Sequence, residues 1–281
     1  MQMPQDRIIR VGQIKTRYWA EGSGGTPIVL IHGLGGFVES WSANFDTLAG
    51  RQRVYALDLP GHGRSDKPMD MAYGIADLAG FLKDFLSALE IERACLVGHS
   101  LGGALAAQFT LLYPSVVERL VLVSSAGLGR ELAAGLRLGT LPGLGETFTR
   151  PVRARTRISA QTLIHNPKMI TEQLLDLFYE MASQPGAHAA YLKTLRANVD
   201  WRGQQVRRYA PIVQGLGTIR QPVLIIWGRE DRLVPVSHAE FAAKRPPDGQ
   251  VEIFEGCGHI PMYEHSSRFD AALLDFLDRK A

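Results

Sequence analysis

A single serine stands among glycines between an apolar run and a helical run, in the stretch LVGHSLGGALAA at residues 96–107. Glycine favours neither a helix nor a strand interior. Gly98, Ser100 and Gly102 fit the G-x-S-x-G pattern of a sharp strand-to-helix turn, where flanking side chains would collide with backbone. Such a turn would raise the Ser100 hydroxyl above a sheet, at the positive end of a helix, where negative charge is stabilised. The pattern therefore predicts a serine nucleophile.

A serine hydroxyl is a weak nucleophile unless a base accepts its proton. Asp231 in WGREDRLVP and His259 in GCGHIPMYEH each follow an apolar run that predicts a strand, as Ser100 does. Serine, then acid, then histidine is the chain order that accompanies such a strand–serine–helix turn, and the ends of parallel strands can bring three distant residues together. Glu230 and His265 are the neighbouring alternatives, although His265 stands at the entry to a predicted helix. We expect Ser100, Asp231 and His259 to form a catalytic triad.

Acyl transfer also requires two backbone N–H groups that bind a developing oxyanion. One is expected from Leu101, the residue after the nucleophile. The glycine-rich loop HGLGG at residues 32–36 follows an early strand and is expected to supply the other, from Leu34. His32 is expected to orient this loop by hydrogen bonding.

The stretch DLPGHGRSD at residues 58–66 also gathers acidic, basic and hydroxyl side chains. Its Pro-Gly and Gly-His-Gly steps are typical of turns, so we interpret it as a brace for the oxyanion loop. The eight histidines are scattered, and neither an H-E-x-x-H nor a C-x-x-C pair occurs. We therefore expect no metal site, and the expected acyl transfer needs no cofactor.

The bulk composition is that of an ordinary globular protein. The 281 residues are 46% hydrophobic and 21% charged, with 31 basic and 28 acidic side chains and a net charge of +3. This balance gives no reason to expect a nucleic-acid partner. The beginning of the chain lacks the apolar stretch of a signal peptide, and no run approaches the roughly 18 apolar residues of a membrane span. The default expectation is a cytoplasmic protein without a disulfide framework, since there are only two cysteines.

Short apolar runs alternate with helical periodicity along most of the chain. This alternation predicts a mostly parallel sheet with helices on both faces. Strands are expected within residues 8–19 (two), at 27–32, 53–59 and 94–97, from 120, and at 222–228 and 250–255. Helices are expected at 40–48, 75–89, 101–113, 237–244 and 268–278.

The alternation stops between about residues 128 and 208, where we expect helices and no good strand. Helices inserted into a parallel sheet commonly cover the edge that binds ligands. We therefore expect a core formed by residues 1–127 and 209–281, with residues 128–208 as a helical cap. Phe148, Phe178 and Met181 are candidate substrate-binding residues of this cap. The arginine-rich stretch TRPVRARTR could attract anionic substrates or a lipid surface, but a solvated face is the favoured interpretation.

Together, HGLGG, DLPGHGRSD, GHSLGG, WGREDRLVP and GCGHIPMYEH resemble the motifs of the α/β-hydrolase family over nearly the whole chain. The resemblance implies an eight-stranded, mostly parallel sheet with a helical cap, and a Ser-Asp-His triad. Within the family, LDLPGHGRSD with GHSLGG is similar to bacterial carboxylesterases, lactonases and acyltransferase-like members.

The segment NPKMITEQLLDLFYEMA also resembles the cap of the meta-cleavage-product hydrolases, which break C–C bonds in dienoic keto acids. Those enzymes tend to have Asn where this chain has His99, and often Trp where it has Ile260. Dehalogenases and epoxide hydrolases of this fold use an aspartate nucleophile, which Ser100 argues against.

The resulting expectation is a serine hydrolase that cleaves small to medium apolar carboxylic esters through an acyl-enzyme. Two other chemistries stay open, lactone hydrolysis and C–C bond hydrolysis of the meta-cleavage-product type. A non-catalytic ligand-binding protein on the same fold is the alternative from another class. The expected partner is a small-molecule ester, and the sequence leaves the oligomeric state open.

Overall fold

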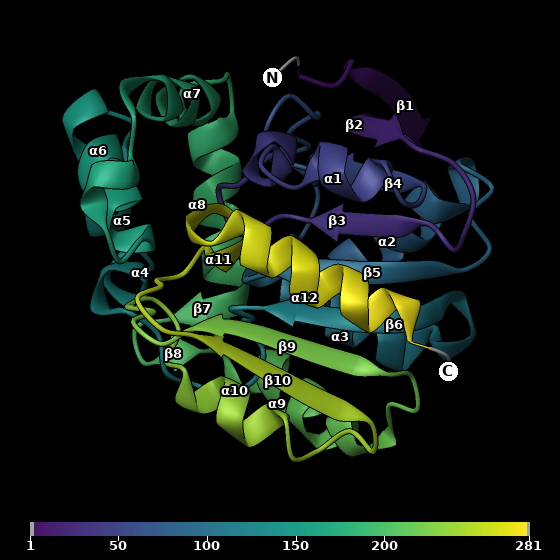
Figure 1. Ribbon diagram of the computed structural model, residues 1–281. Helices are drawn as coiled ribbons and strands as arrows, with labels where there is room; N and C mark the ends of the chain where they lie inside the picture. The colour runs from purple at the N-terminus through teal and green to yellow at the C-terminus, as the bar shows by residue number, and fades with distance from the viewer. Residues whose placement is uncertain (1–2, 280–281) are drawn as a thin grey trace.

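An eight-stranded sheet runs through the centre of the computed structural model, which describes residues 3–279 (Figure 1). Its strand order is β1-β2-β4-β3-β5-β6-β9-β10, antiparallel at β1/β2 and β2/β4 and parallel elsewhere. The strands are β1 (Arg7–Val11), β2 (Ile14–Glu21), β3 (Ile28–Ile31), β4 (Val54–Leu57), β5 (Ala94–His99), β6 (Val117–Val123), β9 (Val223–Gly228) and β10 (Gly249–Phe254).

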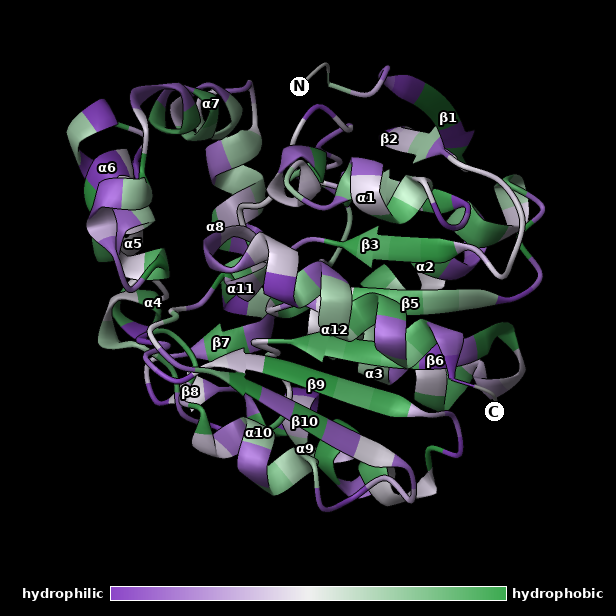
Figure 2. Ribbon diagram, viewed as in Figure 1, coloured by the Kyte–Doolittle hydropathy of each residue, from purple (hydrophilic) through white to green (hydrophobic). Residues whose placement is uncertain are grey.

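The central strands are buried along their whole length, and they are the greenest elements of Figure 2. Parallel strands covered on both faces require apolar side chains on both, which explains why their sequences are continuous apolar runs. On one face lie α2 (Ile75–Ala88), α3 (Leu101–Leu112), α9 (Val206–Gly215) and α10 (Ser237–Ala242). On the other lie α1 (Phe45–Ala49), α11 (Pro261–Glu264) and α12 (Ser266–Asp278).

A separate group of helices lies at the end of the sheet toward which the parallel strands point (Figure 1). It consists of α4 (Ala134–Leu138), α5 (Leu144–Phe148), α6 (Arg153–Leu163), α7 (Glu172–Ala182) and α8 (Ala187–Asn198). Short 3-10 helices occur at Val38–Trp41, Pro114–Val116, Pro167–Met169 and Leu216–Thr218. The division into a core and a cap at residues 128 and 208 stays a prediction, and residue 208 lies within α9.

The expected α/β-hydrolase architecture is confirmed, but two local predictions are wrong. Residues 40–48 do not form one helix, since the 3-10 helix at Val38–Trp41 ends before α1 begins at Phe45. The expected absence of strands from residues 128–208 is also wrong, because β7 (Val199–Asp200) pairs with β8 (Gly203–Gln204). Strands of two residues are too short to show any periodicity. Within residues 3–279, no helix has the length and apolar character needed to cross a membrane.

Candidate active site

Ser100 occupies a strained turn between β5 and α3. Its φ and ψ angles are 53° and −115°, a backbone conformation that residues other than glycine rarely adopt. A Cβ at Gly98 would lie 2.5 Å from the carbonyl carbon of Gly102, and one at Gly102 would lie 2.5 Å from the carbonyl oxygen of His32. Both glycines are therefore required by close backbone approach, as the motif predicts.

The Ser100 backbone is held in this turn by hydrogen bonds on both sides. Its N–H donates to the carbonyl of Val123 at 2.9 Å, and its own carbonyl accepts from Ala126 at 2.9 Å. The turn is thus anchored to the neighbouring strand β6 and the loop that follows it, which fixes the position of the hydroxyl.

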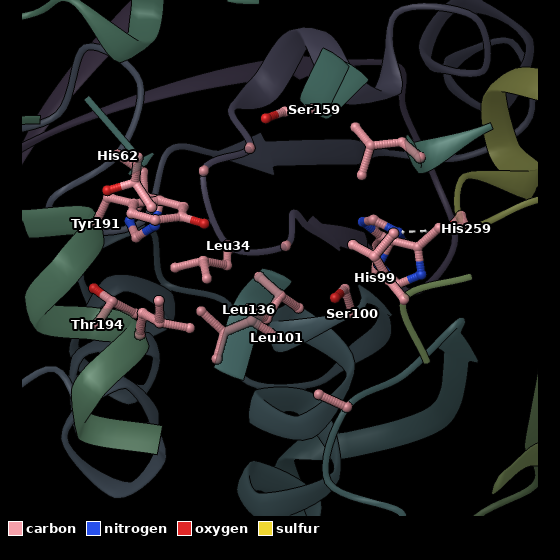
Figure 3. A pocket seen from close by; sticks show the side chains of 18 of the residues that line it. Leu34, His62, His99, Ser100, Leu101, Leu136, Ser159, Tyr191, Thr194 and His259 are labelled. Carbon is pink, nitrogen blue, oxygen red and sulfur yellow. Dashed lines mark hydrogen bonds between the residues drawn. The ribbon is translucent and has the colours of Figure 1, made fainter. Parts of the chain in front are cut away.

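His259 and Asp231 form a hydrogen-bonded pair, with 2.7 Å between Nδ1 and Oδ2. Both side chains are buried. The second carboxylate oxygen of Asp231 accepts hydrogen bonds from the backbone N–H groups of Leu233 at 2.8 Å and Val234 at 3.0 Å. With Nδ1–H donated to the carboxylate, the other ring nitrogen of His259 carries the lone pair. His259 lies beside Ser100 in the same cavity (Figure 3).

The two neighbouring alternatives have other partners. Glu230 accepts a hydrogen bond from the backbone N–H of Cys257 at 2.9 Å, and so ties the loop after β9 to the loop that carries His259. His265 stands at the start of α12, with its Nε2 3.2 Å from the carbonyl of Gly256. Of the two acids and two histidines, the structure brings Asp231 and His259 together.

The glycine-rich loop lies next to Ser100. A Cβ at Gly33 would lie 2.9 Å from the Cβ of Ser100, and Leu34 and Leu101 both line the cavity (Figure 3). His32 holds this loop, because its Nδ1–H donates to the carbonyl of Gly33 at 2.7 Å and its Nε2 accepts from Leu59 N–H at 3.0 Å. Burial of this imidazole lowers its pKa to about 3, so it remains neutral.

The DLPGHGRSD stretch forms a buried ionic brace behind that loop. Asp58 accepts hydrogen bonds from the backbone N–H groups of Val38 at 2.7 Å and Arg64 at 2.8 Å. Arg17, on β2, contacts Asp58 at 3.3 Å and Glu39 at 2.6 Å. Burial raises the pKa of Asp58 to about 6, although the neighbouring guanidinium of Arg17 opposes this rise. These groups connect β2, β4 and the residues after the glycine-rich loop.

His99 has a role that the sequence did not reveal. Its Nε2–H donates to the carbonyl oxygen of His259 at 2.9 Å, and the two ring centroids are 4.8 Å apart. The residue before Ser100 therefore holds the backbone of His259. Burial lowers the pKa of His99 well below its usual value. The only signal in the sequence is its position beside Ser100.

A cavity of about 700 Å³ opens above Ser100, between the sheet and the helices α4–α8. Phe178 and Met181 line it from α7, and Phe178 packs edge-on against Phe37 with 5.6 Å between ring centroids. Phe148 lines it from α5, where its side chain is 61% exposed. Tyr191, on α8, was not predicted; it also lines the cavity and packs over Gly35 of the glycine-rich loop.

Such a sheet, with a strained serine at its C-terminal edge and an acid–histidine pair on later loops, defines a class of hydrolase fold. The chain belongs to the alpha/beta hydrolase fold family, whose model matches residues 26–266.

Among its relatives is a Mycobacterium tuberculosis protein described only as uncharacterised, which is 39% identical over 267 residues. That alignment covers 90% of this chain and 76% of the relative. The 2-hydroxy-6-oxo-2,4-heptadienoate hydrolase of Pseudomonas putida is 31% identical over 275 residues, 96% of this chain and 95% of that enzyme. A solved meta-cleavage product hydrolase from Pseudomonas fluorescens superposes with a TM-score of 0.83 at 27% identity, covering 97% of each chain.

Proposed function

We propose that this protein is a serine hydrolase that cleaves carboxylic esters of small to medium apolar substrates through an acyl-enzyme. One observation carries the proposal, namely that the strained Ser100 and the hydrogen-bonded pair of His259 and Asp231 open on one mainly apolar cavity. A nucleophile, a base and an oriented carboxylate are the groups that acyl transfer needs.

In the first step, the Ser100 hydroxyl attacks the carbonyl carbon of the ester while His259 accepts its proton. Asp231 keeps the imidazole in the required tautomer and stabilises the imidazolium that forms. The backbone N–H groups of Leu34 and Leu101 donate to the oxyanion of the tetrahedral intermediate. His259 then gives its proton to the departing alkoxide, and the alcohol leaves an acyl group on Ser100.

In the second step, a water molecule attacks the acyl carbonyl while His259 accepts one of its protons. The tetrahedral intermediate collapses, the proton returns to the Ser100 oxygen, and the carboxylic acid is released. His99 fixes the base in this cycle through the carbonyl oxygen of His259. The cap at residues 128–208 would select substrates, because Phe148, Phe178 and Met181 face the cavity from it.

C–C bond hydrolysis is the second candidate. Its support is the 31% identity to the dienoate hydrolase of Pseudomonas putida over nearly the full length of both chains. Against it stand His99 and Ile260, at positions where such enzymes tend to have Asn and Trp. Ile260 lines the cavity directly after the base and offers only an apolar side chain.

A substrate panel tests the proposal and separates the two chemistries. The panel contains p-nitrophenyl esters of increasing chain length, lactones, and a 2-hydroxy-6-oxo-dienoic acid. We expect turnover of the esters, and loss of this turnover by about four to six orders of magnitude in Ser100→Ala. Ser159→Ala, which changes another serine in the lining of the same cavity (Figure 3), should retain normal rates. Exclusive turnover of the dienoic acid would instead establish the C–C reaction, and no turnover of any compound would favour a binding protein.

A further inference from the structure

Five exposed residues of the segment from α4 to α6 line the cavity. They are the apolar Leu138, Phe148 and Ile158 and the cationic Arg150 and Arg155, which together we call the cationic mouth. The exposed fractions of the three apolar side chains are 50%, 61% and 63%. Large apolar side chains that cluster at the opening of a cavity mark a contact surface more often than isolated ones do.

The arginines of this region divide into two groups. Arg153 and Arg157 form ion pairs with Glu172 of α7, at 2.8 Å and 2.7 Å, and so hold α6 against its neighbour. Among the described residues, neither Arg150 nor Arg155 has an acidic partner at ion-pair distance, although Arg155 donates to the carbonyl of Thr147. The arginine-rich stretch is therefore only in part the solvated face that its composition suggested.

The cationic mouth has too much positive charge to be a simple apolar contact. Arg150 and Arg155 give the five residues of the mouth a charge of +2, with no acidic side chain among them. A surface that combines arginines with Phe, Leu and Ile side chains matches a lipid layer, whose anionic headgroups lie above acyl chains. A two-fold contact between copies of the chain would instead bring the same arginines toward one another.

We propose that the cationic mouth docks on an anionic lipid surface and admits amphiphilic esters with a long acyl chain directly into the cavity. The substrate class rests on the proposed ester hydrolysis, whereas the docking does not. Phe148 and Ile158 would enter the interface between headgroups and acyl chains while Arg150 and Arg155 contact the headgroups. The acyl chain would then pass between α5 and α6 toward Ser100 without crossing water.

Vesicle flotation with the full-length protein tests the docking. We expect flotation with vesicles in which about a third of the lipid is phosphatidylglycerol, little with pure phosphatidylcholine, and release at about 1 M salt, where charges are screened within about 3 Å. The double variant Arg150→Gln/Arg155→Gln should bind about 30-fold more weakly, since each basic side chain near such a surface contributes roughly 1 kcal/mol. Phe148→Ser/Ile158→Ser should weaken binding about tenfold or more.

Matched controls lie at the opposite end of the molecule. Leu112 ends α3, which begins directly after Ser100 and runs away from the cavity, and its side chain is 49% exposed. Leu112→Ser and the charge control Arg51→Gln/Arg53→Gln should leave flotation unchanged. Equal binding to both vesicle types, no binding to either, or equal loss in the controls would overturn the docking proposal. So would a dimer in light scattering that Phe148→Ser/Ile158→Ser converts to a monomer.

The two proposals can fail separately. Docking is measured by flotation, which Ser100→Ala should not affect, while ester hydrolysis is measured on short, water-soluble esters without vesicles. The substrate class is tested by adding anionic vesicles that contain a long-chain ester. We expect the arginine double variant to lose at least tenfold in rate on this ester and to keep the wild-type rate on the short one. Equal losses on both esters would contradict the proposed entry route.

Discussion

Replacing Gly102 by alanine should damage catalysis through backbone packing alone. The added Cβ would lie 2.5 Å from the carbonyl oxygen of His32 and 2.8 Å from the carbonyl carbon of Ile31. Contacts below 3.0 Å essentially never occur for a real Cβ, so α3 must move away from β3 by roughly 0.5–1 Å. Overpacking of this kind costs about 1–3 kcal/mol of unfolding free energy.

The same movement displaces the N–H group of Leu101 from the position expected for the oxyanion. Loss of one oxyanion donor lowers kcat about 100- to 1000-fold, so we expect Gly102→Ala to lose at least 100-fold in kcat with little change in KM. Steady-state kinetics on the best ester, together with urea unfolding, measure the two effects.

Gly80→Ala is the matched control. Gly80 lies in the middle of α2, and a Cβ there would meet no atom within 4 Å. Alanine should therefore raise the unfolding free energy by up to about 1 kcal/mol through helix propensity, with unchanged kcat. If Gly102→Ala kept more than half of the wild-type kcat, the close approach of α3 and β3 would not position the oxyanion donor.

Three further predictions concern pH, ion pairs and specificity. Burial lowers the pKa of His62 to about 4, whereas its pKa in the unfolded chain is about 6.5. Because the unfolded chain therefore binds a proton first, the unfolding free energy falls as the pH drops from about 6.5 to 4. His62→Asn should reduce the slope of that loss by about 1.4 kcal/mol per pH unit, measured by urea unfolding; an unchanged slope would show that His62 does not titrate in this way. Arg17→Met leaves buried carboxylates without a partner and should cost about 3–5 kcal/mol of unfolding free energy, whereas Arg64→Met, at an exposed ion pair, should cost no more than about 1 kcal/mol; equal losses in thermal unfolding would contradict the brace. Phe178→Ala should change the relative rates of hydrolysis of esters that differ in acyl length. If the rates of all the esters changed by the same factor, this side chain would not select substrates.

The centre of the sheet was predictable from sequence because β3, β4 and β9 are short apolar runs, and a proline directly precedes β3 and β9. The strained turn at Ser100 was equally visible in the sequence. The backbone comes so close at positions 98 and 102 that no residue with a Cβ fits there, and both residues are glycine. Chain order then placed an acid and a histidine after later strands. The family and the fold follow from these local constraints.

Other parts of the site depend on contacts that no local pattern encodes. Glu230 and Asp231 are adjacent acids in one loop, and only the fold shows which of them contacts His259. The hydrogen bond from His99 to His259 joins residues 160 positions apart. The arginines of α6 also looked alike in sequence, and the position of α7 divides them into paired and unpaired groups.

The most direct test of the central claim is labelling with a fluorophosphonate, followed by peptide mass spectrometry. This reagent phosphonylates a serine only when a neighbouring base activates it. We expect one label per chain, on the peptide that contains Ser100, with none in Ser100→Ala and slow labelling in His259→Ala. No label on the wild-type protein, or a label on another serine, would contradict the assignment of Ser100 as the nucleophile.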